Sequence, residues 1–259
     1  MRSSGTAIDA RSASESPVRN LPVHDMSQIH LSDHLTGPGC PLCAIRAAAQ
    51  KRYLETLIYE GVNDPGNRDE LIAGRGYCGR HALALRDEDR EQTGESLGTA
   101  ILYAAVLRER LGELKRLVGV RGRGLTRHVD RASVPPRCPV CGHVAAANRR
   151  AILGLIRLLG DDAWVEAMAR AAFCLEDLLG LWSTVARSGS PAQARFEPIG
   201  EAQVARLAQL TEDLEDLSHN STWDRRQLLT DAQMQSTRRG ADCLAGTESQ
   251  WRRRIGGDS

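Results

Sequence analysis

Apolar residues recur at steps of three and four through most of this chain, a spacing typical of amphipathic helices. The clearest stretch lies at 97–118, where Ala104 fills the one six-residue step in the stripe Leu97, Ile101, Leu107, Leu111, Leu114 and Val118. Aromatic residues make up only 4% of the chain, so the core must consist mainly of Leu, Ile, Val and Ala. We therefore predict an all-α fold.

The predicted helices fall into two similar series. The first begins with Cys-Pro-Leu-Cys at 40–43 and the second with Cys-Pro-Val-Cys at 138–141. In each half a long helix, a polar break and a short helix lead to a third cysteine, 38 residues after the first cysteine in one half and 36 in the other. A longer amphipathic helix closes each half. We interpret the chain as two tandem helical modules related by internal duplication.

Composition places the boundaries of these modules. Residues 119–136 are rich in Gly, Arg and Pro and form the best internal boundary. The predicted order is a disordered tail at 1–35, a zinc-binding module at 36–118, the linker at 119–136, a second module with a divergent metal site at 137–225 and a frayed tail at 226–259.

The formal net charge of +1 gives no overall argument for binding nucleic acid or a membrane. Residues 115–131 hold six Lys or Arg and one acid, so this segment either contacts nucleic-acid phosphates or is a solvated linker. The N-terminal region lacks the apolar core of a signal peptide, and no run approaches a membrane span of about 20 apolar residues. We expect a cytoplasmic protein, in which CxxC motifs indicate metal or redox chemistry before disulfides.

Four residues of the first module form a pattern of zinc ligands: Cys40, Cys43, Cys78 and His81. The two-residue spacing of CxxC lets both sulfurs reach one ion, and Pro41 pre-sets φ for that turn. Cys78 and His81 are three residues apart at the start of a predicted helix, so they share a face. Because zinc prefers thiolate and imidazole in tetrahedral sites, we predict a structural zinc here. Reduced, buried cysteines beside an unrelated histidine are the alternative.

The second module offers a divergent set: Cys138, Cys141, Cys174 and Asp177. Asp177 takes the place of His81, and a carboxylate is a harder ligand than imidazole. Three outcomes are open: Asp177 completes the site, His143 or His219 replaces it, or the site holds metal weakly or not at all. An incompletely liganded metal would also suit catalysis.

Other chemistries rank below structural zinc. A redox role for either CxxC fits a βαβ setting better than helices, and iron–sulfur clusters more often use four cysteines. Cys243 is a lone thiol without an evident partner. A pocket between helices, or internal ion pairs, would account for a polar group in the first half: Tyr53, Glu60, Asp64 and Arg68.

Several runs together resemble a known family: CPLC at 40–43, RYL at 52–54, YEGVNDP at 59–65 and GYCGRHAL at 76–83. The chain resembles, over about 38–225, a family of uncharacterised bacterial proteins that form a domain of unknown function with duplicated CPxC and CxxH motifs. The resemblance implies an all-helical, zinc-binding protein and no established activity. The family pattern would place His where this chain has Asp177.

The function we expect from these features is interaction: an adaptor or regulatory protein with structural zinc, an unknown protein partner and no membrane association. One alternative is a metal-dependent enzyme at the divergent site of Cys138, Cys141, Cys174 and Asp177. Another is a nucleic-acid-binding protein that uses the basic linker. An exposed apolar groove would favour the adaptor, an open metal the enzyme and a continuous Arg surface nucleic acid.

Overall fold

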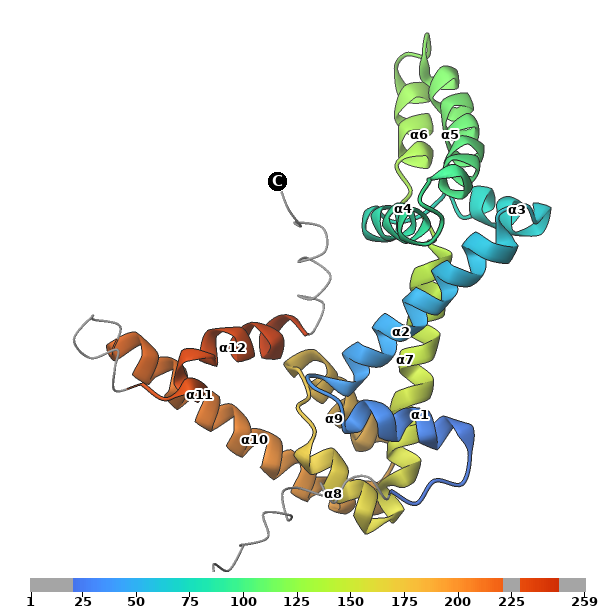
Figure 1. The fold of residues 1–259 in the computed structure, drawn as a ribbon. Coiled ribbons are helices and arrows are strands. Elements are labelled where there is room, and N and C mark those ends of the chain that lie inside the picture. The colour runs from blue at the N-terminus through green and yellow to red at the C-terminus, as the bar shows by residue number, and fades with distance from the viewer. Residues whose placement is uncertain (1–20, 221–228, 247–259) are drawn as a thin grey trace, which may run out of the picture. The chain divides into compact units, whose positions relative to one another are not determined.

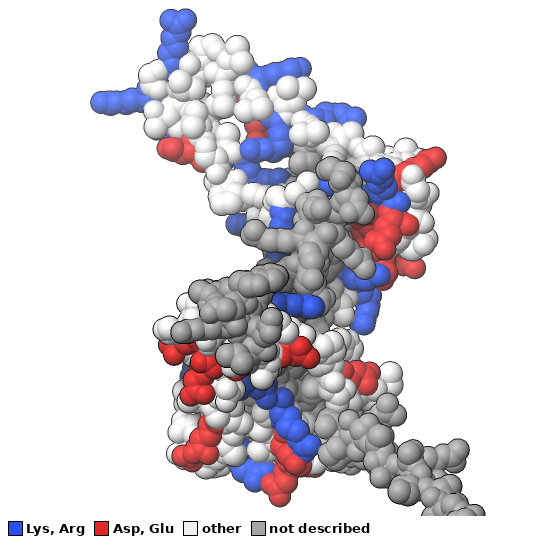
Figure 2. All heavy atoms as spheres, turned by 60° about the vertical axis from the view of Figure 1, so that its left-hand side comes forward, with Lys and Arg blue, Asp and Glu red and all other residues white. Residues whose placement is uncertain are grey.

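The computed structural model describes residues 21–220 and 229–246. These residues form helices and turns and no strand (Figure 1), so the all-α prediction is confirmed. None of the helices within the described ranges combines the length and the apolar character needed to cross a membrane. Acidic and basic side chains are both spread over the face drawn in Figure 2, in keeping with a formal net charge near zero.

The chain divides into two compact units. The central unit comprises residues 42–152, and the terminal unit comprises residues 1–41 together with 153–259. These boundaries differ from those of the predicted modules. The first series of helices lies almost entirely in the central unit, and the second series begins there.

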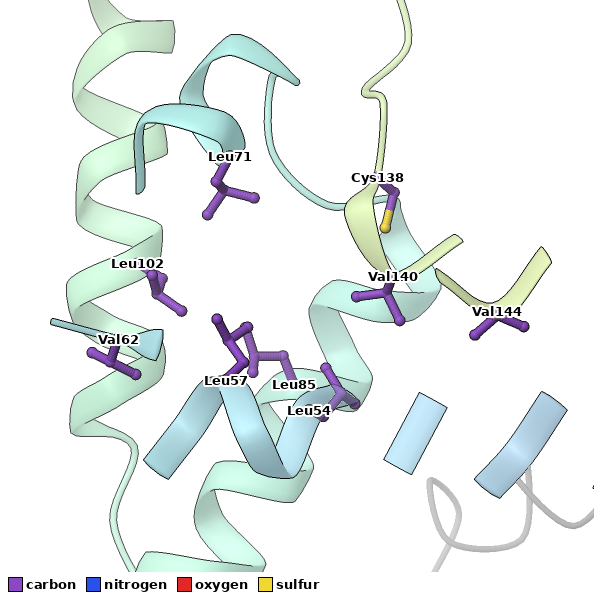
Figure 3. Close-up of a cluster of buried hydrophobic side chains, with 9 residues drawn as sticks. All are labelled: Leu54, Leu57, Val62, Leu71, Leu85, Leu102, Cys138, Val140 and Val144. Atoms are coloured by element: carbon purple, nitrogen blue, oxygen red, sulfur yellow. The ribbon is translucent and has the colours of Figure 1, made fainter. Parts of the chain in front are cut away.

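The central unit is built from six helices and a single π turn. They are α2 (Pro41–Thr56), the π turn (Leu57–Gly61), α3 (Pro65–Ala73), α4 (Gly79–Thr93), α5 (Leu97–Leu117), α6 (Arg123–Ala132) and the first part of α7 (Pro139–Arg157). Figure 3 shows its buried core, which consists of Leu54, Leu57, Val62, Leu71, Leu85, Leu102, Cys138, Val140 and Val144. The start of α7, from the second series, thus completes a core made by the first.

Helices α2 and α7 lie side by side and antiparallel within this unit. The rings of Tyr53 and His143 are 5.1 Å apart, and Arg46 Nη1 donates to Asn148 Oδ1 at 3.3 Å. The CxxC motif at the start of α7 therefore lies near the end of α2, away from the CxxC motif at the start of α2.

Helix α5 carries two apolar faces. Thr99 and Leu102 are buried, and the Asp89 carboxylate at 1% exposure accepts a hydrogen bond from Thr99 N at 2.7 Å. The stripe noted in the sequence lies on another face: Leu107 is 64% exposed and Val118 83% exposed. Amphipathic surface helices ordinarily turn their apolar stripe to the core, and most of this stripe faces outward.

The segment predicted to be a linker, 119–136, contains a helix. Gly119 and Gly122 adopt φ of +88° and +64°, which only glycine accepts readily, and they turn the chain back beside α5. Arg75 and Arg110 both donate to the carbonyl of Ala132, at 3.0 and 2.8 Å, and so fasten the end of α6. No residue of α6 is buried, so its solvent exposure fits the polar composition that suggested a linker.

The terminal unit contains the remaining helices and a short 3₁₀ turn. These are α1 (Met26–Leu35), the end of α7, the turn (Leu158–Gly160), α8 (Asp162–Arg170), α9 (Leu175–Arg187), α10 (Ser190–His219), α11 (Asp231–Met234) and α12 (Ser236–Ala245). Trp164, Met168, Leu181 and Ile199 are among its fully buried side chains.

Both predicted tails contain helices in their described parts. Asp25 caps α1 by accepting from Gln28 N, and Leu31 and Leu35 are buried. Arg239 of α12 donates to the Asp213 carboxylate of α10 at 2.5 Å. Local capping and one ion pair therefore order segments whose composition alone suggested disorder; residues 1–20, 221–228 and 247–259 lie outside the described ranges.

The two halves share their helix order and their caps. Asp64 and Asp161 precede α3 and α8, and each carboxylate accepts a hydrogen bond from the backbone N–H two residues later. Cys78 and Cys174 precede α4 and α9 with nearly identical extended dihedral angles, φ −68° ψ 161° and φ −73° ψ 161°. The repeat read from the sequence therefore has a counterpart in local structure.

The two faces of α5 predict opposite effects of the same substitution. We expect Leu102→Ala to lower the free energy of unfolding by about 2–5 kcal/mol, because it leaves a cavity in the core. Leu107→Ala, on the exposed face, should change it by less than about 0.5 kcal/mol. Urea denaturation followed by circular dichroism measures both, and similar losses would contradict the assignment of faces.

Candidate metal centres

The loop before α4 presents Cys78 and His81. Gly76 adopts φ of +96°, and a Cβ there would lie 3.0 Å from Val106, so glycine is required for this turn. Cys78 then sits in extended backbone just before the helix, and His81 follows in its first turn. Both side chains consequently leave the helix start on one face.

The loop before α7 meets this helix start directly. Arg137 N donates to Gly74 O at 2.7 Å, and a Cβ on Gly74 would lie 2.9 Å from the Arg137 carbonyl. This backbone contact brings Cys138 and Cys141 to the residues before α4. The resulting group, Cys78, His81, Cys138 and Cys141, is called the central cluster, and its ligand atoms all lie within 4.8 Å of one another.

The distances in the central cluster fit one tetrahedral ion. His81 Nδ1 lies 3.2 Å from Cys78 Sγ, 3.4 Å from Cys138 Sγ and 3.2 Å from Cys141 Sγ. Cys78 Sγ and Cys141 Sγ are 3.7 Å apart. Ordinary zinc–ligand bond lengths would put sulfurs about 3.8 Å apart and sulfur and nitrogen about 3.6 Å apart. Three thiols around one ring nitrogen exceed what a single lone pair can accept in hydrogen bonds.

The other ring nitrogen of His81 is held by Gln50. His81 is fully buried, and its Nε2 lies 3.0 Å from Gln50 Oε1. Arg80 Nη2 lies 3.3 Å from the same nitrogen, but a guanidinium only donates. A tautomer with its proton on Nε2 donates to Gln50 and leaves Nδ1 free to bind metal, an arrangement typical of metal-ligating histidines.

The thiols of the central cluster do not ionise alike. Burial raises the pKa of Cys78, but hydrogen bonds from the His81 backbone N–H and from neighbouring thiols outweigh it, so this pKa is lowered. Burial and the contact with Cys78 raise the pKa of Cys141 to about 12. Like charges this close disfavour one another, so a cation is required for all three sulfurs to be thiolates together.

The pairing differs from the one predicted from the sequence. Cys78 and His81 meet the second CxxC motif rather than Cys40 and Cys43. The reason is the length of α2: its 16 residues rise about 24 Å, which separates the CxxC turn at its start from the core at its end. The short helix α3 cannot return the chain over that distance.

The remaining candidates form a second group, called the terminal cluster: Cys40, Cys43, Cys174 and Asp177. Their ligand atoms also lie within 4.8 Å of one another, and all four residues are buried. Cys40 Sγ and Cys174 Sγ donate to Asp177 Oδ2 at 3.0 and 3.2 Å. Asp177 thus takes the place of the His81 imidazole, and the His143 and His219 alternatives belong to neither cluster.

Arg46, one helical turn after Cys43, brings positive charge to the terminal cluster. Its Nη2 donates to Cys43 Sγ at 3.0 Å, while Nη1 donates to Asn148 Oδ1. With a metal bound by three thiolates, an aspartate in place of a histidine would add one negative charge, and Arg46 would offset it. Neither Arg46 nor Gln50 was identified from the sequence; their signal was a polar side chain one or two turns after a CxxC, in the part of the helix that is otherwise apolar.

Two cavities are lined by other candidate residues from the sequence. One of about 430 Å³ in the central unit is lined by Tyr53, Glu60, Asp64 and His143 among others, while Arg68 is not part of it. The pKa of His143 is lowered, mainly by burial and further by the positive charges of Arg150 and Arg52. A second cavity, of about 260 Å³ in the terminal unit, is lined by Cys40, Cys174 and the otherwise unassigned Cys243, whose pKa is raised by burial.

Residues 22–247 match a protein family described as a family of unknown function, DUF6062. This chain belongs to the DUF6062 family. The matched range includes both helical repeats and all eight clustered residues, and it confirms the resemblance to a family of unknown function.

A curated relative of this DUF6062 protein is an uncharacterised 23.9 kDa protein in the xynA 3′ region of Caldicellulosiruptor sp. (strain Rt8B.4). The two are 35% identical over 69 residues, which is 27% of this chain and 31% of the relative. The matched part thus spans less than a third of that protein's length. No solved structure matches the chain.

The central cluster predicts which disulfide forms on oxidation. In metal-stripped Cys138→Ser protein treated with diamide, we expect Cys78 to link to Cys141, because their sulfurs are 3.7 Å apart. Non-reducing peptide mapping by mass spectrometry identifies the linked peptides. A link from Cys78 to Cys40 or Cys43 would contradict the structure and favour the pairing within each half.

Proposed function

We propose that this protein is a zinc-stabilised helical interaction protein of the cytoplasm, in which two metal ions cross-link the two repeats of the chain. The observation that carries the proposal is the central cluster, where three sulfurs and one imidazole nitrogen surround a common point at tetrahedral spacing. A set of three cysteines and one histidine is typical of structural zinc sites.

The terminal cluster supports a second ion of the same kind. Its three sulfurs and one carboxylate are also zinc ligands, and Arg46 offsets the extra negative charge. Full burial of its four ligands argues for a structural role over a catalytic one, because a catalytic metal keeps a position open to substrate. Each ion would join a CxxC turn of one repeat to the helix start of the other.

Interaction rather than catalysis is also supported by the surface of the central unit. The exposed apolar residues of α5 gather on one face of the helix, and the core of the central unit is built on a different face. Contiguous exposed apolar surface is a common feature of binding sites.

Paired cysteine substitutions test the metal sites and their pairing together. We expect Cys78→Ser with Cys138→Ser to remove one zinc per chain, because both residues serve the central cluster. Cys40→Ser with Cys78→Ser should remove both zinc ions, because it disables each cluster. Zinc per chain is measured by plasma mass spectrometry after purification without added metal.

The reverse result, one zinc left in the Cys40 and Cys78 pair and none in the Cys78 and Cys138 pair, would support sites within each half. Parent protein without zinc would overturn the proposal. Cys243→Ser, outside both clusters, is the matched control and should keep the parent's zinc content.

Gln50 provides a finer test of the central site. We expect Gln50→Leu to weaken metal binding there by about 10- to 100-fold, because His81 loses the acceptor that holds its tautomer. Gln50→Glu keeps an acceptor and should restore most of the affinity, and Gln92→Leu on α4 should have no effect. Competition with a chelator, using the absorption of thiolate-bound cobalt(II), measures the affinity; equal affinities of the parent and Gln50→Leu would argue against this role.

A further inference from the structure

An uninterrupted heptad pattern lies on the exposed face of α5. With heptad positions a and d assigned from Leu97, every such position through the C-cap of the helix is apolar: Leu97, Ala100, Ala104, Leu107, Leu111, Leu114 and the capping residue Val118. All seven residues are exposed, and they are called the α5 seam. The seam extends over three heptads, or about 32 Å of helix.

The core of the central unit does not use this seam. The buried residues of α5, Thr99 and Leu102, lie on a different face, and α6 buries none of its own residues. Two apolar residues in every seven, at the spacing of 3.5, is the pattern that a helix presents to another helix in a coiled coil. The small residues Ala100 and Ala104 allow a second backbone to approach closely.

Positive charge borders the seam. Arg108 and Lys115 occupy two of the three e positions on one side, are exposed and form no ion pair with any described residue. Ile101 occupies the third e position. Arg110 occupies a g position on the other side and pairs with Glu113. Figure 2 shows Lys and Arg side chains projecting from the end of the central unit that α5 and α6 form.

We propose that the α5 seam binds an amphipathic helix of a partner protein that carries apolar a and d residues and acidic e and g residues. Opposite charges at these flanking positions set partner choice in coiled coils. This inference rests on the proposed interaction function and names the chemistry of the partner.

Other occupants fit the seam less well. A second copy of α5 would bring Arg108, Arg110 and Lys115 against like charges in either orientation. A membrane surface favours a broader apolar face with aromatic residues, and the seam contains none. Nucleic acid would use the arginines and leave the leucines exposed.

A designed peptide serves as the probe. It is a labelled three-heptad helix with Leu at a and d, Glu at e and g, and Ala or Gln elsewhere; a matched peptide carries Lys at e and g. Fluorescence anisotropy with the zinc-containing protein measures binding. We expect the Glu peptide to bind at least about tenfold more tightly than the Lys peptide, because its e and g residues attract the basic residues beside the seam, whereas those of the Lys peptide repel them. Arg108→Glu with Lys115→Glu should invert this order.

The double variant Leu107→Glu with Leu114→Glu tests the seam itself. It should lower the affinity for the Glu peptide by about tenfold or more. Leu179→Glu on α9 is the matched control, because Leu179 has the same 64% exposure as Leu107, and it should bind like the parent. Circular dichroism confirms that each variant keeps its helices.

Several results would overturn the proposal: no peptide binding, equal binding by parent and seam variant, a parent dimer that the seam substitutions dissociate, or binding of anionic vesicles through the same leucines without binding of the peptide. Zinc content is measured on the same samples. If the protein retains zinc and does not bind the peptide, only the proposal for the α5 seam is rejected. If the protein contains no zinc, the metal proposal is rejected whether or not the peptide binds.

Discussion

The fold of the central unit depends on the meeting of two helix starts. The backbone of Arg137 is bonded to that of Gly74, and around this contact four sulfur and nitrogen ligands converge on one point. Without a bound cation, three thiols and a fully buried imidazole would destabilise this contact between the helix starts, because thiolates repel one another and neutral thiols make poor hydrogen bonds. The divalent ion that we propose for this site would resolve both difficulties and would give the core residues beside it a fixed frame on which to pack.

The charge of each cluster explains how two different ligand sets can serve the same geometry. Histidine in the central cluster leaves three negative ligands, and Gln50 fixes its ring. Aspartate in the terminal cluster makes four, and Arg46 donates to one of the sulfurs. Each ligand set is accompanied by a different polar side chain of α2, Gln50 beside His81 and Arg46 beside Cys43, as expected where groups bonded to the ligands tune a metal site.

Much of this structure was accessible from the sequence. Periodicity predicted the helices, and the two repeated cysteine patterns included all eight residues that the structure gathers into two clusters. The sequence did not predict which CxxC motif lies beside Cys78 and His81. Ligand types indicate which residues can share an ion, whereas the length of α2 determines which of them lie close together. The face of α5 was also ambiguous: Leu102 and Leu107 look alike in sequence, and burial is decided by helices that pack from elsewhere in the chain.

The crossed pairing has a consequence for how such a chain arises. A protein made of one repeat has no complete cluster of its own; it gains both only by exchanging CxxC turns with a second, identical chain around a twofold axis. In that symmetric pair the two clusters must have the same four ligands, since one gene encodes both. Joining the repeats in a single chain removes this restriction. Asp177 in the position that corresponds to His81 is a difference that two identical single-repeat chains could not have.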